Sequence, residues 1–252
     1  MDVAGALWPY IYPALVVALG YGVLGVTGFG SALIIVPLLA WRWPLSEVVP
    51  LVLLMDVGAS ALMGRLNLQQ VHWAELRRLV PGMVLGCGLG LLLFSSAPSA
   101  WPLLALGAYV AWVGVRALRH TAVPMTDAPR WQGWAYGAGV GLVQMSFGTA
   151  GPLVLAWLAR RGIAAPAVRA STPIIMLAVA VFVLGLFALQ GRLSHALMWQ
   201  RLLVLLPVAL GAVAVGHAVA HRLPATRLRR AICALLVISG AMLMVNALRQ
   251  LG

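Results

Sequence analysis

The sequence predicts an all-α polytopic membrane protein, with about eight hydrophobic segments in two inverted repeats. Each repeat is predicted to open with a glycine-broken or re-entrant helix. Three observations lead to this prediction. Of the 252 residues, 63% are hydrophobic and only 9% are charged, whereas a soluble domain carries about 25% charged residues. Mean hydropathy is +1.00, which is typical of a membrane protein. Related glycine-rich stretches also occur in both halves of the chain.

Eight apolar segments account for most of the chain. They are Trp8–Ala40, Leu45–Gly64, Leu79–Phe94, Trp101–Leu118, Trp134–Leu158, Ala164–Gln190, Leu202–Ala220 and Ala231–Leu248. A span needs about 20 residues, but the first segment has 33. One straight helix of that length would measure about 50 Å, against a hydrocarbon core of about 30 Å. The first segment must therefore continue as a half-helix or turn back within the membrane, and the sequence leaves both open.

The break is predicted inside GVLGVTGFGSALIIVP, from Gly22 to Pro37. Each glycine in a helix interior costs about 1 kcal/mol relative to alanine, and this stretch places four of them within nine residues. A related stretch, GVGLVQMSFGTAGP, runs from Gly139 to Pro152. We expect short half-helices to start near Ser31 and Thr149. The alternative is that the glycines only allow close packing of helices.

Four further matches between the halves predict a duplication. FGSA at 29–32 matches FGTA at 147–150, and Gly64-Arg65-Leu66 matches Gly191-Arg192-Leu193. Trp73 matches Trp199, and Pro81 matches Pro207. The first repeat is predicted to cover residues 1–125 and the second 126–252, within one integral membrane domain. The Pro-containing stretch 119–131 is the predicted linker, and the polar stretch 65–78 is predicted to lie at the membrane interface.

All 17 basic residues are Arg, and they lie almost entirely between apolar segments. That distribution indicates topology signals rather than a nucleic-acid-binding face. Eight simple crossings would divide these residues almost evenly between the two sides. If each half instead begins with an element that returns to its starting side, 13 Arg lie inside and four outside. The positive-inside rule therefore favours two inverted halves with broken helices, a recurring transporter architecture.

A half-helix that starts inside the membrane directs its free N–H groups and positive dipole end inward, which suits an anion. Ser31 and Thr149 would cap such helices or donate to a ligand. Asp56 lies near the centre of the second segment, where a charge costs roughly 2.5–3.5 kcal/mol. We expect Asp56 to bind a coupling proton or cation, or to organise the site; the alternative is a protonated or hydrogen-bonded structural residue.

Arg169 lies at the start of the sixth segment. It either extends to the cytoplasmic interface or pairs with a ligand anion. Gln144, Ser171 and Thr172 are further polar candidates in apolar segments, with structural roles favoured for each.

The chain resembles the TauE/SafE family of anion exporters. The resemblance rests on GVTGFGSALIIVPLL at Gly25–Leu39 and FGTAGPLVLAWLARRGIAAPAVRAST at Phe147–Thr172, and it covers both halves. Where the second family motif usually has more glycine, this chain has Ser146, Thr149 and Ala150, a departure that bears on the substrate. The resemblance implies Gly28, Gly30, Pro37, Gly148, Gly151, Pro152 and Arg169 as site elements. The predicted substrate site consists of these residues other than Pro37, together with their motif neighbours Phe29, Ser31, Phe147 and Thr149.

The predicted function is therefore export of a small sulfur-containing anion, sulfite or an organosulfonate, across a bacterial inner membrane. Import of a related anion and a structural role in a membrane assembly are the alternatives. An intramembrane enzyme is disfavoured, because no catalytic residue set, metal site or cofactor motif is evident. The expected partners are the anionic substrate and the lipid bilayer, with no nucleic acid. The coupling ion, the direction of transport and a homo-oligomeric state are left open.

Overall fold

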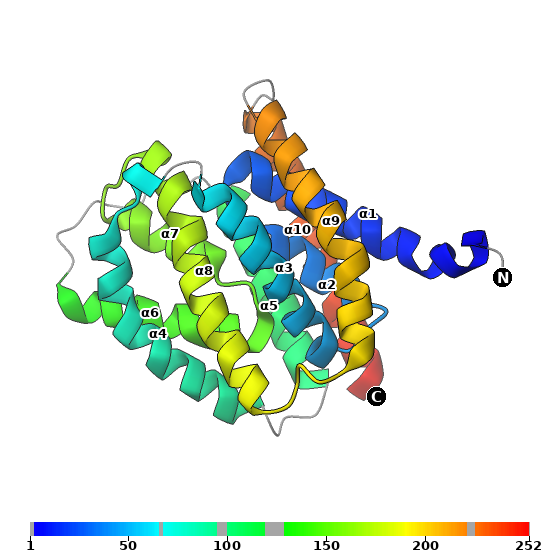
Figure 1. Cartoon of the computed structure of the whole chain (residues 1–252). Helices are drawn as coiled ribbons and strands as arrows, with labels where there is room; N and C mark the ends of the chain where they lie inside the picture. Colours follow the sequence, from blue (N-terminus) through cyan, green and yellow to red (C-terminus); the bar gives the residue numbers. More distant parts are fainter. Residues whose placement is uncertain (1–2, 66–67, 95–99, 119–128, 221–224, 252) are drawn as a thin grey trace.

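The computed structural model describes residues 3–65, 68–94, 100–118, 129–220 and 225–251. These residues form α-helices joined by short connections, with one 3₁₀ turn (Figure 1). The elements are α1 (Val3–Thr27), α2 (Ser31–Leu39), α3 (Leu45–Arg65), η1 (Leu68–Gln70), α4 (Trp73–Phe94), α5 (Ala100–Leu118), α6 (Arg130–Phe147), α7 (Gly151–Arg160), α8 (Ala165–Leu189), α9 (Ala196–Val219) and α10 (Ala225–Leu251). The predicted all-α membrane fold is confirmed.

The first and fifth apolar segments are each broken into a long and a short helix. In the first break, α2 turns back along α1: the Tyr12 hydroxyl donates to the Leu38 carbonyl oxygen at 2.8 Å, and Gly20 faces Ile35. In the second, α7 turns back along α6, with the rings of Tyr136 and Trp157 5.3 Å apart. Each break therefore makes a helical hairpin rather than a continuing half-helix.

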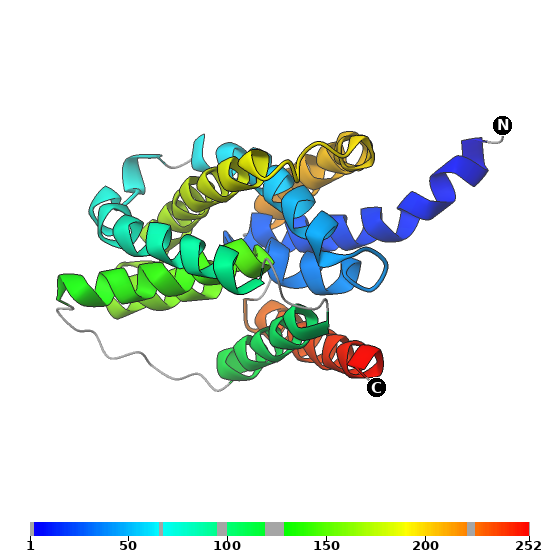
Figure 2. The ribbon, with the colours of Figure 1, turned by 90° about the horizontal axis from the view of Figure 1, so that it is seen from below.

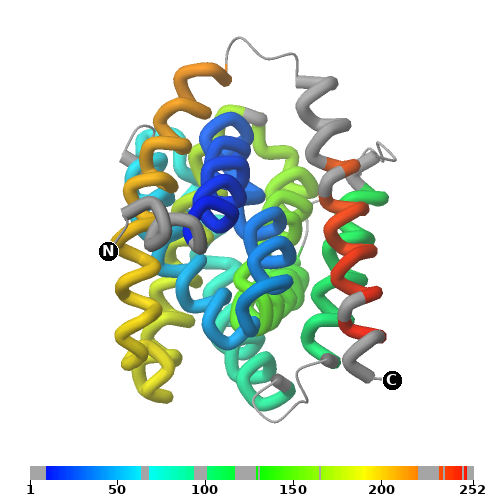
Figure 3. Tube along the Cα trace, turned by 90° about the vertical axis from the view of Figure 1, so that its right-hand side faces the viewer, coloured from blue at the N-terminus to red at the C-terminus, as the bar shows by residue number. Residues whose placement is uncertain are grey.

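Helices far apart in the sequence pair along their lengths. The central pair is α3 and α8, while α4 packs on α6, α1 on α9, and α5 on α10. Figure 2 shows α5 and α10 side by side, below the other helices. In Figure 3 the same pair forms one side of the molecule, with α1 and α9 on the other. The short α2 lies inside this arrangement, since Ile34, Ile35 and Val36 have no exposed surface.

Five of the described helices are long and apolar enough to cross a membrane. These stretches are Tyr10–Thr27, Leu45–Met63, Trp73–Leu93, Pro166–Leu189 and Ala196–Val219. Large apolar side chains such as Leu85, Leu92 and Leu203 lie exposed on their outer faces, at 64 to 74% of full exposure. Such surfaces are favourable against lipid and unfavourable against water.

Several predicted boundaries were wrong at their starts. The third segment begins at Trp73 rather than Leu79, so much of the polar stretch 65–78 belongs to the first turns of α4. Similarly, α9 begins at Ala196 and α10 at Ala225. Hydropathy alone misses these starts because polar and charged residues, such as Glu75, Arg77 and Arg78 in α4, lower the mean hydropathy there. The predicted linker falls mostly on residues 119–128, outside the described residues.

Glycines allow α4 and α6 to approach each other closely. A Cβ atom on Gly86 would meet the backbone of Ala138, and one on Gly82 would meet the backbone of Trp134. Small residues at such crossings are typical of helix packing in membranes. By contrast, a Cβ atom on Gly88 of the same helix would meet nothing within 4 Å.

We therefore expect Gly86→Val to destabilise the protein by about 1–3 kcal/mol, because the added side chain forces α4 away from α6. Gly88→Val is the matched control, with the same change on the same helix in open space. Thermal unfolding in detergent measures both variants. An equal loss of stability in the two would contradict the close packing described here.

Candidate functional site

The tips of the two hairpins meet at a pocket in the middle of the molecule. Gly151, which begins α7, lies against the side chain of Phe29 from the first tip. The pocket has an empty volume of about 380 Å³, part of it open at the mouth. Its lining consists of Leu24, Gly28, Phe29, Gly30, Ser31, Ala32, Leu33, Asp56, Ser60, Gly148, Thr149, Gly151, Pro173 and Met176. Both tips and both central helices, α3 and α8, therefore contribute to one site.

Glycines at the tips adopt left-handed backbone conformations, which is why the sequence places them there. The φ angles are +83° at Gly28, +95° at Gly30 and +67° at Gly148. A residue with a Cβ atom pays roughly 1–2 kcal/mol for this conformation. The reversal lets α2 begin at Ser31 and α7 at Gly151, both with their N-termini at the pocket. The second start lies two residues beyond the predicted one.

Polar side chains from within the hairpins hold the tips in shape. The N–H of Phe29 donates to the hydroxyl of Thr27 at 3.3 Å, and the N–H of Ala150 donates to Oε1 of Gln144 at 3.0 Å. From α5, outside the hairpins, the Tyr109 hydroxyl also donates to the Thr149 carbonyl at 3.1 Å. No side chain caps either short helix, however. The positive dipole ends of α2 and α7 thus begin at the pocket. In α7, Pro152 has no N–H and the N–H of Leu153 donates to the Ala150 carbonyl, so the N–H of Gly151 is the one left for a ligand in that first turn.

Thr149 is the clearest sign of a ligand in this pocket. It is 2% exposed, lines the pocket, and its hydroxyl has no hydrogen-bond partner among the described residues. The Nε2 group of Gln144, which is fully buried, is also without a partner there. Buried polar groups in native proteins are nearly always hydrogen-bonded, so an unpaired hydroxyl on a pocket wall calls for a bound molecule or water.

Asp56 lies in the same pocket, on α3, and is 8% exposed. Its Oδ1 atom accepts hydrogen bonds from the Tyr21 hydroxyl at 2.8 Å and the Ser31 hydroxyl at 3.0 Å. The hydroxyl of Ser31 is thus committed to Asp56, whereas that of Thr149, its counterpart in the second tip, is free of such a bond. The described lining residues include no Arg, so Asp56 is the only one that can carry a full charge.

The remaining predicted residues lie around the pocket rather than on its wall. Arg169 is exposed and donates from Nη2 to the carbonyl of Val26 at 2.8 Å, in the last turn of α1. Its backbone packs against Gly28. Pro37, Phe147 and Pro152 are also absent from the lining. Arg169 is therefore placed to neutralise the carbonyl end of α1 beside the first tip.

The other polar candidates make structural contacts. The Ser171 hydroxyl accepts the N–H of His72 at 3.0 Å, and the Thr172 hydroxyl donates to the Val168 carbonyl at 2.8 Å. Sequence reasoning missed Tyr21, Ser60 and Met176. Their residue types are ordinary in membrane helices, and only their position at the pocket distinguishes them. Among the described residues, no group of three His, Cys, Asp or Glu side chains is placed to hold a metal ion.

The sequence was also compared with known proteins. The family described as "Sulfite exporter TauE/SafE" matches residues 13–243. This chain belongs to the TauE/SafE family. It is 38% identical over 190 residues to "Probable inner membrane transporter protein TsaS" of Comamonas testosteroni, a match that covers 75% of this chain and 80% of that protein. No solved structure matches the chain. The TauE/SafE protein described here is thus a multi-pass membrane transporter of the inner membrane.

The left-handed conformation at Gly30 gives a direct test of the first tip of this TauE/SafE transporter. A Cβ atom there would meet nothing within 4 Å, so Gly30→Ala adds backbone strain without a clash. We expect a loss of about 1–2 kcal/mol in unfolding free energy. Gly22→Ala is the control, because Gly22 lies in the helical part of α1, also in open space, where alanine is favoured. Thermal unfolding that ranks Gly22→Ala as the more damaging change would refute the tip geometry.

Proposed function

We propose that this transporter exports a small sulfur-containing anion, such as sulfite or an organosulfonate, by alternating access. One observation carries the proposal: Thr149, whose buried hydroxyl has no partner among the described residues, lines a pocket formed where two helix N-termini without side-chain caps meet. In this proposal the anion binds between the tips, receiving hydrogen bonds from Thr149 and from first-turn N–H groups. The family match supports a sulfur oxyanion, and the transporter name of the relative supports transport.

Two helix dipoles supply the positive potential in a pocket that lacks Arg. Each N-terminus acts as roughly +0.5 of an elementary charge, so two facing the same ligand approach one full charge. Their effect is larger in a low-dielectric interior than in water. Backbone N–H groups and a hydroxyl also suit an oxyanion with several acceptor oxygens. Such a site releases its ligand more readily than a buried guanidinium pair would, because it contains no opposite full charge.

Asp56 is the proposed coupling residue. A carboxylate beside an anion would repel it, so binding of the anion favours a protonated Asp56 or a co-bound cation. Ser31 connects the two events, because its hydroxyl donates to Asp56 and its backbone begins the helix that faces the anion. Uptake of a proton or cation at Asp56 would free that hydroxyl to turn to the substrate.

The proposed cycle uses the two halves, residues 1–125 and 126–252, as inverted repeats that move against each other. Each half supplies one hairpin tip and one central helix to the pocket. The asymmetric distribution of Arg supports opposite orientations in the bilayer. Transport needs no catalytic group, and the described lining contains neither His nor Cys. The proposed partners are therefore the anion and the surrounding lipid.

Thr149 gives a test of anion binding. We expect Thr149→Val to raise the apparent KM for anion flux about tenfold or more, since a hydrogen bond to a charged ligand contributes roughly 1.5–3 kcal/mol. Thr149→Ser, which keeps the hydroxyl, should stay near wild type. Thr172→Val is the matched control, because the Thr172 hydroxyl bonds within its own helix. Proteoliposome flux of sulfite, thiosulfate and organosulfonates measures all three. Absence of flux for every anion tested in the wild type would reject the proposed function.

Asp56 gives a test of coupling. We expect Asp56→Asn to abolish the dependence of anion flux on an imposed proton or cation gradient, while downhill exchange of the anion persists. The reason is that an amide keeps the shape of the carboxyl but cannot take up a proton. Tyr21→Phe, which removes one hydrogen bond to the carboxylate, is the control and should retain gradient dependence. Unchanged gradient dependence in Asp56→Asn would remove Asp56 from the coupling step.

A further inference from the structure

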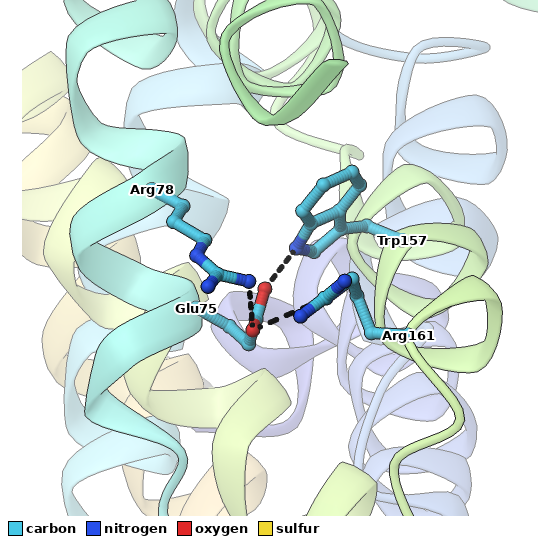
Figure 4. Close-up of polar contacts among 4 residues, drawn as sticks. All are labelled: Glu75, Arg78, Trp157 and Arg161. Carbon is cyan, nitrogen blue, oxygen red and sulfur yellow. Dashed lines mark hydrogen bonds and ion pairs between the residues drawn. The ribbon is translucent and has the colours of Figure 1, made fainter. Parts of the chain in front are cut away.

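A buried carboxylate joins the far end of α7 to the beginning of α4. Glu75 is 5% exposed and accepts three hydrogen bonds: from Nε1 of Trp157 at 2.9 Å, from Arg78 at 2.9 Å and from Arg161 at 3.3 Å. Figure 4 shows Trp157 and Arg161 approaching Glu75 from one side and Arg78 from the other. We name Glu75, Trp157 and Arg161 the α4–α7 latch. Its two sides come from different halves of the chain.

A second ionic cluster occurs at the far end of α2. Arg201 of α9 bonds Glu47 at the start of α3, with Nη1 and Oε2 2.6 Å apart. Its guanidinium also lies over the ring of Trp43, 4.1 Å from the centroid. We name Arg201, Glu47 and Trp43 the α9–α3 latch. It likewise joins the two halves, through Arg201 from the second and the other two residues from the first.

Glu75 of one latch and Arg201 of the other occupy matching positions with the charge exchanged, whereas their ion-pair partners, Arg161 and Glu47, do not align with one another. The offset of 126 that aligns Trp73 with Trp199 also aligns Glu75 with Arg201. The offset of 118 that aligns the two tips also aligns Trp43 with Arg161. Glu75 on α4 thus bonds Arg161 and Trp157, which follow the second tip in the sequence. Arg201 on α9 bonds Glu47 and lies over Trp43, both of which follow the first tip. The repeated feature is an inter-half ion pair, although the residues differ.

Each latch holds the short helix whose other end forms the pocket. The α7 helix begins at Gly151 in the pocket wall, and Trp157 lies six residues on, about 9 Å along the axis. Likewise, α2 begins at Ser31 in the wall and ends four residues before Trp43. A displacement of either helix end therefore moves an anion-binding tip.

The latches lie at opposite ends of the molecule. Glu47 is in the first turn of α3, whereas Glu75 follows the end of α3 by ten residues. This helix of 21 residues is about 30 Å long. In Figure 1 the start of α4 lies at the upper left and the start of α9 at the lower right. Both latches are formed, with the pocket between them.

We propose that the two latches are the gates of the transport cycle, broken one at a time, each opening the pocket toward its own end. This inference rests on the proposed transport function. The Glu75–Arg161 pair is buried, and a buried pair adds little net stability compared with an apolar contact, yet breaking it without solvating the charges is costly. In the α9–α3 latch the Arg201 side chain is 13% exposed and that of Glu47 is 41% exposed, so this pair is already partly hydrated and easier to break. Each gate therefore has two states: in one the ion pair is formed, and in the other it is broken and both charges are hydrated. Intermediate degrees of opening are disfavoured. Glu75 and Arg201 act as positioning residues through α7 and α2.

The test uses a single cysteine in the pocket, Ser60→Cys, in a chain carrying Cys87→Ala and Cys233→Ala. An impermeant thiol reagent is added from one side of sealed, oriented membrane vesicles and then from the other. We expect Glu75→Gln to raise labelling from the α4–α7 side about tenfold, the change that ~1.4 kcal/mol in closing free energy gives. Arg201→Gln should raise it from the opposite side. Arg77→Gln, an exposed neighbour of Glu75, is the control and should change neither.

A charge-exchanged variant, Glu47→Arg with Arg201→Glu, distinguishes loss of the ion pair from misfolding. It should return labelling toward wild type, although only partly, because the contact with Trp43 is lost. Increased labelling from the same side in both single variants, or from neither side, overturns the gate assignment. Labelling needs no substrate, so the two proposals fail separately. Side-specific labelling without anion flux rejects the proposed function, whereas flux with unchanged labelling rejects the latches.

Discussion

The structure depends on satisfying backbone polar groups where two helices are broken inside an apolar protein. An N–H group left without a partner in a low-dielectric interior costs free energy comparable to a lost hydrogen bond. Here Thr27 and Gln144 bond the N–H groups of Phe29 and Ala150, and Arg169 bonds a carbonyl of α1. The two short helices begin at one pocket, where the two tips touch. The helices around them bring these tips together and exclude lipid.

In the proposed function, this arrangement would separate the attraction for an anion from any fixed positive charge. A buried guanidinium would hold an oxyanion tightly, whereas helix N-termini and a hydroxyl provide comparable potential with weaker individual bonds. The full charge in the pocket, Asp56, has the opposite sign, and Tyr21 and Ser31 hydrogen-bond it. The Arg residues instead neutralise carbonyls and carboxylates away from the pocket, as Arg169, Arg161 and Arg201 do. The charge distribution thus suits a ligand that must be released as well as bound.

Much of the site could be anticipated because its parts are local in sequence. A short stretch of sequence is enough to predict each glycine at positive φ, the short helix that follows it, and the carboxylate in the middle of an apolar segment. Helix starts were less predictable, because α4 and α9 carry charged residues near their starts, Glu75 and Arg77 in α4 and Arg201 in α9, which lower the local hydropathy. The partners of Asp56 and Glu75 were not predictable at all. Tyr21 lies 35 residues from Asp56, and Trp157 lies 82 residues from Glu75, with no pattern linking the members of either pair.

The sequence by itself determined the membrane class, the family and the positions of both breaks, since composition and glycine act over a few residues. It left undecided whether each broken segment continues or turns back. The tertiary structure decided that question in favour of hairpins, because α2 packs along α1 and α7 along α6. It also decided that the two tips meet, and that the Thr149 hydroxyl is left unpaired while that of Ser31 is bonded to Asp56. At both ends of the molecule, it brings opposite charges from the two halves together. These outcomes depend on packing between helices distant in sequence, which no local pattern specifies.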